Sequence, residues 1–330
     1  MSKSLTTGTP ASLGFCPDRT VGLMHVLQSE VASQRLPGAV ALIARHGQVL
    51  LHSSVGMQMP ALGKPMALDS IFRIYSMTKP VVSVAILMLM ERGKLLLSDP
   101  VSKHLPEFAN VQVMAHVNSH TVLHHPKAAP TVQDLLRHTS GLTYEILGTE
   151  PIQKQYAQAR LASRERSNAE FSQALAAMPL MFEPGTTWEY SRATDLLGAL
   201  LEVVAGQSLG DFLQHNIFGP LGMVDTAFHV PPEKHHRIAE PFESDPDGGI
   251  AMKLIDVRQP ARMEACGAGL VSTSADYARF LQCLLNGGEL DGVRILGLNT
   301  VRYMTADHLG TIGVHRAGRS GELLPPGHGF

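Results

Sequence analysis

The chain has 330 residues, of which 44% are hydrophobic and 5% aromatic, and its formal net charge at pH 7 is −2. A nearly neutral chain without runs of like charge lacks the basic surface that attracts nucleic acids or anionic membranes, so we expect neither partner. Three cysteines without a C-x-x-C pair predict neither a disulfide framework nor a zinc site, and they fit a reducing compartment.

The N-terminal stretch does not match a secretory signal. Residues 1–15 lack the apolar run of ~7–15 residues that a secretory signal needs. No stretch reaches the ~18 apolar residues of a membrane-spanning helix. The sequence therefore predicts a cytoplasmic protein, and its length allows roughly two domains.

The first predicted elements are a helix and a β-hairpin. Residues 17–35 carry apolar side chains at helical spacing from Val21 to Val31. Two apolar runs then flank His46-Gly47, which predicts a hairpin with its turn at these two residues. This order indicates the start of a layer that combines a sheet with helices.

Helical patterns dominate from about residue 70 to about residue 250. The run "PVVSVAILMLM", residues 80–90, is apolar on nearly every side, which predicts a helix in the protein interior. Thr131 as N-cap, Asp134 in the capping-box position and Gly141 as stop signal predict a later helix. These segments indicate a mostly helical middle of the chain.

After about residue 250 the pattern changes again. The stretch "GAGLVSTSADYARFLQCLL" predicts a short strand, an N-cap at Ser272 or Ser274, and a helix.

Two serines stand in nucleophile-like motifs. "GQSLG", residues 206–210, matches the G-x-S-x-G pattern, but the preceding "DLLGALLEVVA" repeats at helical rather than strand spacing. Ser208 is thus expected between two helices, with Gly206 as a C-cap and Asp211 completing a capping box. We interpret it as a structural serine.

"SMTKP" offers the other serine. Ser76 and Lys79 lie one turn apart at the start of the apolar helix, where unpaired N–H groups and the positive end of the helix favour an oxyanion. The same field and the apolar surroundings favour a neutral lysine that can act as a base. The alternative is a purely structural role, with Ser76 as a helix cap and Lys79 in solvent, because chance matches to a four-residue motif are common.

Tyr190 is the third candidate. It follows "PGTTWE" and directly precedes a predicted helix, so its hydroxyl can point into a cleft. With Ser76 and Lys79 it would form a nucleophile and a two-part proton shuttle for acyl transfer. The alternative is a half-buried aromatic whose hydroxyl is hydrogen-bonded.

Several stretches together resemble the serine β-lactamase-related superfamily, and within it the family VIII carboxylesterases, which are similar to class C β-lactamases. They are "FRIYSMTKPVVSVAILMLMERGKLLLSDPV", "TVQDLLRHTSGL", "PGTTWEYSRATDLLGALLE", "IFGPLGMVDTAF" and "GAGLVSTSADYARFLQCLLNGGELDGVRIL". The resemblance follows family order over nearly the whole chain. It implies Ser76 as the nucleophile, with Lys79 and Tyr190 as the proton-transfer pair.

The resemblance also implies the fold and the division of the chain. The fold would be a class C β-lactamase or penicillin-binding-protein-like one, α/β plus all-α, with an antiparallel sheet flanked by helices and a helical domain. We expect an α/β domain from residues 1–68 and 255–330, a mostly helical domain at 69–254, and the active site in the cleft between them. Ser191 and Arg192 are expected to contact the substrate, and Tyr144 is expected either to line the cleft or simply to pack in the protein interior.

Two departures from the family pattern matter. Penicillin-recognising members carry Asn two residues after the tyrosine, where this chain has Arg192, which favours an esterase. The family's third motif, Lys-Thr-Gly or a variant, is not found before Phe330, and we interpret "HRAG", residues 315–318, as a chance match. We therefore expect missing C-terminal strands and a second oxyanion donor beyond Phe330.

These residues predict a serine hydrolase that cleaves small or short-chain carboxylic esters without cofactor or metal. The alternatives are a β-lactamase or D-alanyl-D-alanine peptidase, an amide hydrolase or acyltransferase on the same scaffold, and a non-catalytic binding module. A small-molecule ester is the expected partner, and a homodimer stays open. The histidines at 116, 120, 124 and 125 are interpreted as a surface loop or strand rather than a metal site. His138 is expected to serve the helix C-terminal dipole.

Overall fold

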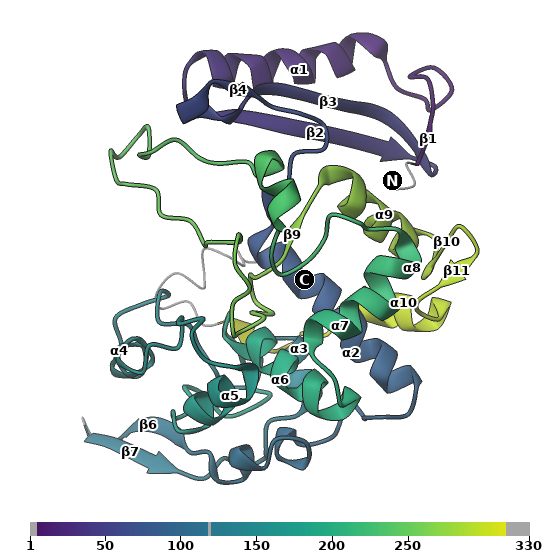
Figure 1. The fold of residues 1–330 in the computed structure, drawn as a ribbon. Coiled ribbons are helices and arrows are strands. Elements are labelled where there is room, and N and C mark those ends of the chain that lie inside the picture. The colour runs from purple at the N-terminus through teal and green to yellow at the C-terminus, as the bar shows by residue number, and fades with distance from the viewer. Residues whose placement is uncertain (1–4, 118–119, 315–330) are drawn as a thin grey trace. The chain divides into compact units, whose positions relative to one another are not determined.

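A computed structural model describes residues 5–117 and 120–314 of the chain (Figure 1). The chain forms two compact units. The first comprises residues 1–75, 214–260 and 270–294, and the second comprises residues 76–213, 261–269 and 295–330. The division into domains at 1–68 with 255–330 and at 69–254 stays a prediction.

The β-hairpin of the first unit forms as the sequence predicts. Strands β2 (Gly38–Arg45) and β3 (Gln48–Met59) pair antiparallel, and the turn between them falls at His46 and Gly47. Both turn residues have positive φ, 52° and 75°, which matches the right-handed twist of a two-residue hairpin. The short strands β1 (Thr6–Thr7) and β4 (Lys64–Pro65) extend this sheet at β3.

Two helices pack on this hairpin. Helix α1 (Pro17–Ala32) contacts β3, and Figure 1 shows it running along one face of the sheet. Helix α9 (Ser274–Leu285) contacts β2, and the hydroxyl of Ser274 lies 3.0 Å from the ring nitrogen Nε2 of His52. A sheet-plus-helix layer therefore forms where the sequence predicts one.

The other elements of the first unit are short. They are η1 (Pro60–Leu62), β5 (Phe72–Arg73), the π-helical turn η5 (Gln214–Phe218), α8 (Gly219–Leu221), η6 (Pro232–Arg237), β9 (Val271–Ser272), β10 (Glu289–Leu290) and β11 (Val293–Arg294). Strand β5 pairs antiparallel with β9, and β10 pairs with β11.

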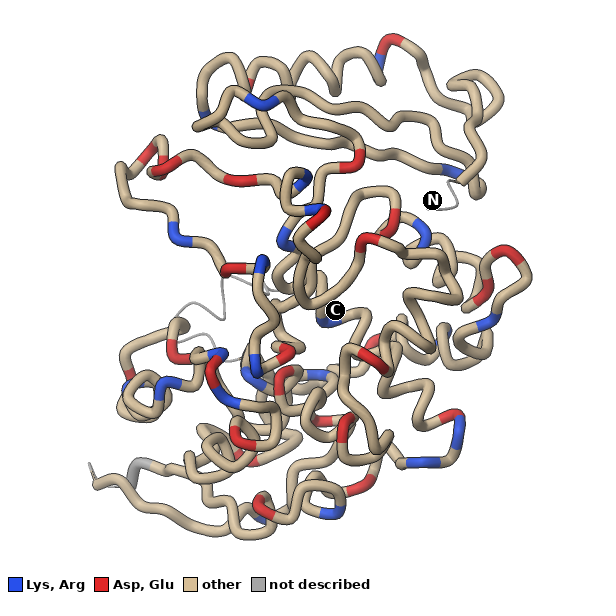
Figure 2. Tube along the Cα trace, viewed as in Figure 1, with Lys and Arg blue, Asp and Glu red and all other residues tan. Residues whose placement is uncertain are grey.

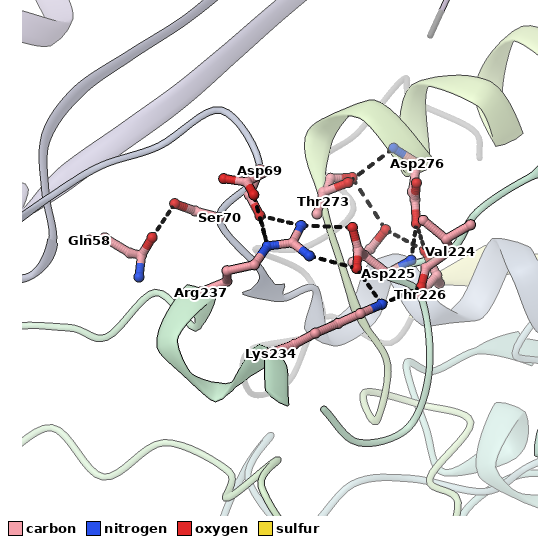
Figure 3. A network of polar contacts seen from close by, with 11 residues as sticks. Gln58, Asp69, Ser70, Val224, Asp225, Thr226, Lys234, Arg237, Thr273 and Asp276 are labelled. Atoms are coloured by element: carbon pink, nitrogen blue, oxygen red, sulfur yellow. Dashed lines mark hydrogen bonds and ion pairs between the residues drawn. The ribbon is translucent and has the colours of Figure 1, made fainter. Parts of the chain in front are cut away.

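A polar network joins separate segments of the first unit (Figure 3). The Asp225 carboxylate accepts hydrogen bonds of 2.7 Å from Lys234 and 2.7 and 2.9 Å from Arg237, and Arg237 also pairs with Asp69. Burial alone would raise the pKa of Asp225, but the hydrogen bonds from Arg237 and Lys234 outweigh it and hold that pKa below its ordinary value. The network ties residues that lie far apart along the chain.

Helix α2 (Thr78–Glu91) is the buried helix that the sequence predicts in the second unit. Residues from Val81 to Leu89, apart from the half-buried Ser83, are buried. Helix α6 (Ala193–Ala205) contacts α2, α3 (Val132–Leu136) and α5 (Asn168–Ala176), so α6 lies at the centre of the helical packing. Burying these apolar faces is the main stabilising term for helices of this kind.

The rest of the second unit surrounds this core. It consists of η2 (Tyr75–Met77), which begins one residue before the unit, η3 (Val101–Lys103), η4 (Pro106–Asn110), β6 (Val113–Val117), β7 (His120–His124), α4 (Pro151–Gln158), β8 (Thr187–Trp188), α7 (Leu209–Leu213), α10 (Leu298–Met304) and β12 (Gly313–Val314). Strands β6 and β7 form an antiparallel hairpin, so this histidine-bearing segment is strand rather than helix.

Two predicted helix boundaries are wrong. The capping box of Thr131 and Asp134 is present, but α3 ends at Leu136 rather than near Gly141. The Asp134 carboxylate binds the Thr139 hydroxyl at 2.7 Å, which turns the chain just after the helix. The cap of α9 is Thr273, between the two predicted serines, because its hydroxyl accepts the Asp276 N–H.

Charged residues of both signs are interspersed along each unit (Figure 2). Among residues 5–117 and 120–314, no single helix is both long and apolar enough to cross a bilayer. One pair, Ala193–Ala205 with Leu209–Leu221, meets that requirement by length and composition only, and the two segments are bent by 78°.

Candidate active site

The reactive serine lies where the chain enters helix α2. Ser76 is exposed in the short turn η2 and directly follows Tyr75, whose φ of 43° lies in the left-handed region. A non-glycine residue held there costs on the order of 1–3 kcal/mol, and such strain clusters at functional sites. The N–H groups of this first turn have no acceptor within the helix, so they can face an anionic oxygen.

The structure brings Ser76, Lys79 and Tyr190 together. The hydroxyl of Ser76 lies 2.8 Å from the phenol oxygen of Tyr190, and the Lys79 Nζ donates to the same hydroxyl at 3.1 Å. Nζ also lies 4.6 Å from the centre of the Tyr190 ring. One hydroxyl therefore contacts two groups that can accept or return its proton.

Lys79 is fixed from behind by a chain of polar contacts. Its Nζ donates at 2.8 Å to the backbone carbonyl of Gly267, and the N–H of Gly267 donates at 2.7 Å to the carboxylate of Asp195. Asp195 is 1% exposed and pairs with Arg192 at 3.2 Å, and Arg192 also pairs with Glu145. The amine next to Ser76 is thus held by a buried carboxylate acting through one glycine.

Aromatic rings hold Tyr190 in place. The rings of His138 and Tyr144 lie 5.1 and 5.2 Å from that of Tyr190, and Trp188 stacks on it at 6.4 Å. Burial, and then the nearby Lys79 charge, lower the pKa of His138 to about 3. Burial, and then the Asp195 charge, raise the pKa of Tyr144 well above its ordinary value. Both neighbours of Tyr190 are therefore neutral at physiological pH.

A cavity of about 340 Å³ opens at these residues. Ser76, Lys79 and Tyr190 line it together with His138, Thr194 and Met304, among others. The volume suits a small organic ligand.

Three further predicted residues are placed behind the cavity lining rather than in it. Tyr144 is 7% exposed and packs between Tyr190 and Arg192. Ser191 is fully buried and lies 3.0 Å from the Nδ1 atom of His138, while Arg192 is engaged by Glu145 and Asp195. A substrate contact for these residues stays a prediction.

Ser208 has the structural surroundings that the sequence predicts. It is exposed between α6 and α7, its hydroxyl donates to the Asp211 carboxylate at 2.8 Å, and it accepts the Asp211 N–H at 3.1 Å. Gly206 ends α6 with a φ of 66°. The G-x-S-x-G motif here is a helix ending followed by a helix cap.

Sequence reasoning missed three residues of this site. His138 lies just past the Arg137 C-cap of α3 with a φ of 57°, but it is buried and neutral and packs on Tyr190 instead of offering a charge to the helix end. Asp195 and Gly267 act only through contacts that span 72 positions, so no local spacing indicates them. The sole signal was their place in the family-like stretches, "YSRATD" and "GAGL".

Within residues 5–117 and 120–314, no group of three or more His, Cys, Asp or Glu side chains could hold a metal ion. The "HRAG" stretch, residues 315–318, lies outside the described residues.

Comparison with known proteins places the chain among serine hydrolases. The family described as Beta-lactamase matches residues 23–330. Protein Rv1367c of Mycobacterium tuberculosis is 35% identical over 83% of this chain and 68% of its own length, and Esterase EstB of Burkholderia gladioli is 34% identical over 78% and 68%. The solved structure of EstCE1, "a hydrolase with promiscuous acyltransferase activity", superposes with a TM-score of 0.72 at 26% identity, covering 89% of this chain and 80% of that one.

Proposed function

Since this chain belongs to the β-lactamase family, we propose that it is a carboxylesterase that forms an acyl-enzyme on Ser76. The family VIII esterase resemblance and the β-lactamase-like fold expected from the sequence are confirmed by the matches above. One observation carries the proposal: the Ser76 hydroxyl lies within hydrogen-bond distance of both Tyr190 and Lys79. Among the described residues, this is where a nucleophile meets two proton carriers.

The first half of the reaction breaks the ester. The Ser76 oxygen attacks the ester carbonyl carbon while its proton passes to the Lys79–Tyr190 pair, and the carbonyl oxygen becomes an oxyanion next to the Ser76 N–H. The tetrahedral intermediate collapses when the carbon–oxygen bond to the alcohol breaks. The leaving alkoxide takes the proton back from the pair and departs as a neutral alcohol.

The second half regenerates the enzyme. A water molecule gives a proton to the same pair, attacks the acyl carbon, and releases the carboxylic acid as the proton returns to Ser76. Which of Lys79 and Tyr190 holds the proton at each point is a property of the coupled pair. The neutral Tyr144 and His138 rings pack on Tyr190 and keep its ring in position, and they take no part in the proton transfer.

Arg192, two positions after Tyr190, favours an ester over a β-lactam as the substrate. In penicillin-recognising relatives the residue two positions after the tyrosine is an Asn that binds the substrate amide. Here it is Arg192, whose side chain is 14% exposed and pairs with Glu145 and Asp195. An amide group of the substrate would lack that partner.

Acyl transfer to an alcohol is the second candidate function. EstCE1 carries both activities in its description, and the same acyl-enzyme would serve both reactions. The two differ only in whether water or an alcohol attacks the acyl carbon. Adding a primary alcohol during hydrolysis of p-nitrophenyl butyrate and measuring free butyrate against the butyrate ester of that alcohol separates them.

Labelling with a fluorophosphonate tests the nucleophile directly. The chain should be labelled once, Ser76→Ala should not be labelled, and Ser208→Ala should be labelled as well as the unchanged chain. Intact mass after brief exposure to p-nitrophenyl butyrate should show one butyryl adduct. An unlabelled wild-type chain, or label that persists in Ser76→Ala, would contradict the proposal.

A further inference from the structure

A second cavity of about 140 Å³ lies next to the one at Ser76. The two cavities share five lining residues, namely Ser83, Leu136, Arg137, Met304 and His308. Leu87, Leu97 and Tyr303 line only the second cavity. The two cavities are therefore neighbours, and the pair is called the channel.

The turn η2 and one face of helix α2, which follows it directly, line the channel along its length. Ser76, Pro80 and Ser83 line the first cavity, and Ser83 and Leu87 line the second. These positions follow each other by four, three and four residues, which is the spacing of one helix face. At ~1.5 Å per residue, about 16 Å separate Ser76 from Leu87 along the axis.

The polar side chains of the second cavity already bind each other. Arg137 donates to Thr139 and Asp134, each at 2.9 Å, and to the His308 carbonyl at 3.2 Å. Gln133 donates to the Tyr303 hydroxyl at 3.0 Å. The remaining wall consists of Leu87, Leu97, Leu136 and Met304 with the hydroxyl of Ser83, so a ligand there gains mainly by burying apolar surface.

We propose that this channel holds the acyl chain of the substrate, so that the preferred esters carry a linear acyl group of roughly eight to ten carbons. Such a chain is about 9–11 Å long when extended, at ~1.25 Å per carbon–carbon bond, and fits within the roughly 16 Å of this face once the ester bond to Ser76 and the contact at the far end are included. The proposal rests on Ser76 being the nucleophile. It replaces the short acyl group expected from the sequence with a medium-chain one. The carboxyl carbon lies at Ser76 and the chain end lies near Leu87 and Leu97.

A series of p-nitrophenyl esters from acetate to dodecanoate, kept below micelle-forming concentrations, measures the channel length. Each buried methylene should raise kcat/KM up to about fourfold, and the gain should stop near ten carbons. Leu97→Trp should fill the second cavity and lower the ratio of kcat/KM for decanoate over butyrate about 100-fold. The matched control is Leu96→Trp, because Leu96 is 58% exposed and lines neither cavity.

A binding measurement separates the channel from the catalytic proposal. In calorimetric titration, Ser76→Ala should bind sodium decanoate more tightly than sodium butyrate. Adding Leu97→Trp should lower the affinity for decanoate at least tenfold. An equal ratio in the Leu97 and Leu96 variants, or decanoate binding that Leu97→Trp leaves unchanged, would overturn the channel. Absent ester cleavage with intact decanoate binding would refute only the catalytic proposal.

Discussion

The contact between Gly267 and Lys79 makes a sharp prediction about a single methyl group. A Cβ added at Gly267 would lie 2.9 Å from both carboxylate oxygens of Asp195 and 3.0 Å from the Tyr144 hydroxyl. Asp195 is 1% exposed and held by Arg192, so the carboxylate has no room to withdraw. We therefore expect Gly267→Ala to displace the backbone at residue 267, and with it the carbonyl that positions Lys79.

The size of the effect follows from this geometry. Relieving the overlap takes a shift of about half an ångström or more, and a misplacement of about 1 Å at a reacting group costs about 10²-fold in rate. We expect kcat for p-nitrophenyl butyrate to fall between about 10- and 100-fold, with KM changed little. The overpacking itself costs roughly 1–3 kcal/mol of stability.

A matched variant separates rate from stability. Gly210→Ala would place a Cβ 2.4 Å from a carboxylate oxygen of Glu264, in helix α7 and away from Ser76. It should destabilise the chain comparably, as measured by urea unfolding, and leave kcat unchanged. If the kcat of Gly267→Ala equals that of Gly210→Ala, the proposal that Gly267 positions Lys79 is refuted.

A double-mutant cycle locates the cause in Asp195. Asp195→Ala removes the acceptor of the Gly267 N–H and the two carboxylate oxygens that lie closest to the new methyl group, while the Tyr144 hydroxyl at 3.0 Å stays. Its own kcat should fall, and Gly267→Ala should then cost little more, giving strong non-additivity. Additive losses would show that the two residues act independently.

Three further predictions concern other parts of the chain. Ser208→Ala should lose about 1 kcal/mol of stability with its helix cap and keep full fluorophosphonate labelling, which intact mass checks. Because burial keeps His138 neutral down to a pKa of about 3, stability should fall below about pH 6.5 by up to ~1.4 kcal/mol per pH unit, and His138→Asn should flatten that slope in urea titrations. Asp225→Asn should lower the free energy of unfolding by about 3 kcal/mol, because Arg237 and Lys234 lose their carboxylate partner. The pKa of Asp225 is lowered in the folded chain, so its contribution is lost only when the folded carboxyl is protonated, and the difference between the variant and the unchanged chain should vanish at acidic pH. A flat pH profile for the unchanged chain, or a difference at Asp225 that persists in acid, would contradict these two.

Local patterns were sufficient wherever the structure is decided by neighbours along the chain. The hairpin turn at His46 and Gly47, the capping box at Thr131 and the helix cap at Ser208 all depend on residues within a few positions. The S-x-x-K motif belongs to this class, because one helical turn places Lys79 next to Ser76.

The rest of the site depends on contacts that no local pattern encodes. Tyr190 reaches Ser76 across 114 positions, so its place before a predicted helix makes it a candidate, but only the family resemblance implies its role beside Ser76. His138 lies near the predicted helix end, but its role is decided by burial against Trp188 and Tyr190, which are distant in the sequence. The second cavity is invisible in sequence, since Leu97 and Tyr303 look like ordinary apolar and aromatic positions.

Arg192 connects the choice of substrate with the placement of the base. Asn at this position in penicillin-recognising relatives faces the substrate, whereas Arg192 turns to Asp195 and Glu145. Burial opposes the Arg192 charge, but the Asp195 and Glu145 carboxylates outweigh it and raise the pKa of Arg192 further. Arg192 in turn pairs with Asp195, whose carboxylate accepts the Gly267 N–H, and the Gly267 carbonyl accepts a hydrogen bond from Lys79. The residue that stands in place of that Asn therefore belongs to the chain of contacts that positions Lys79.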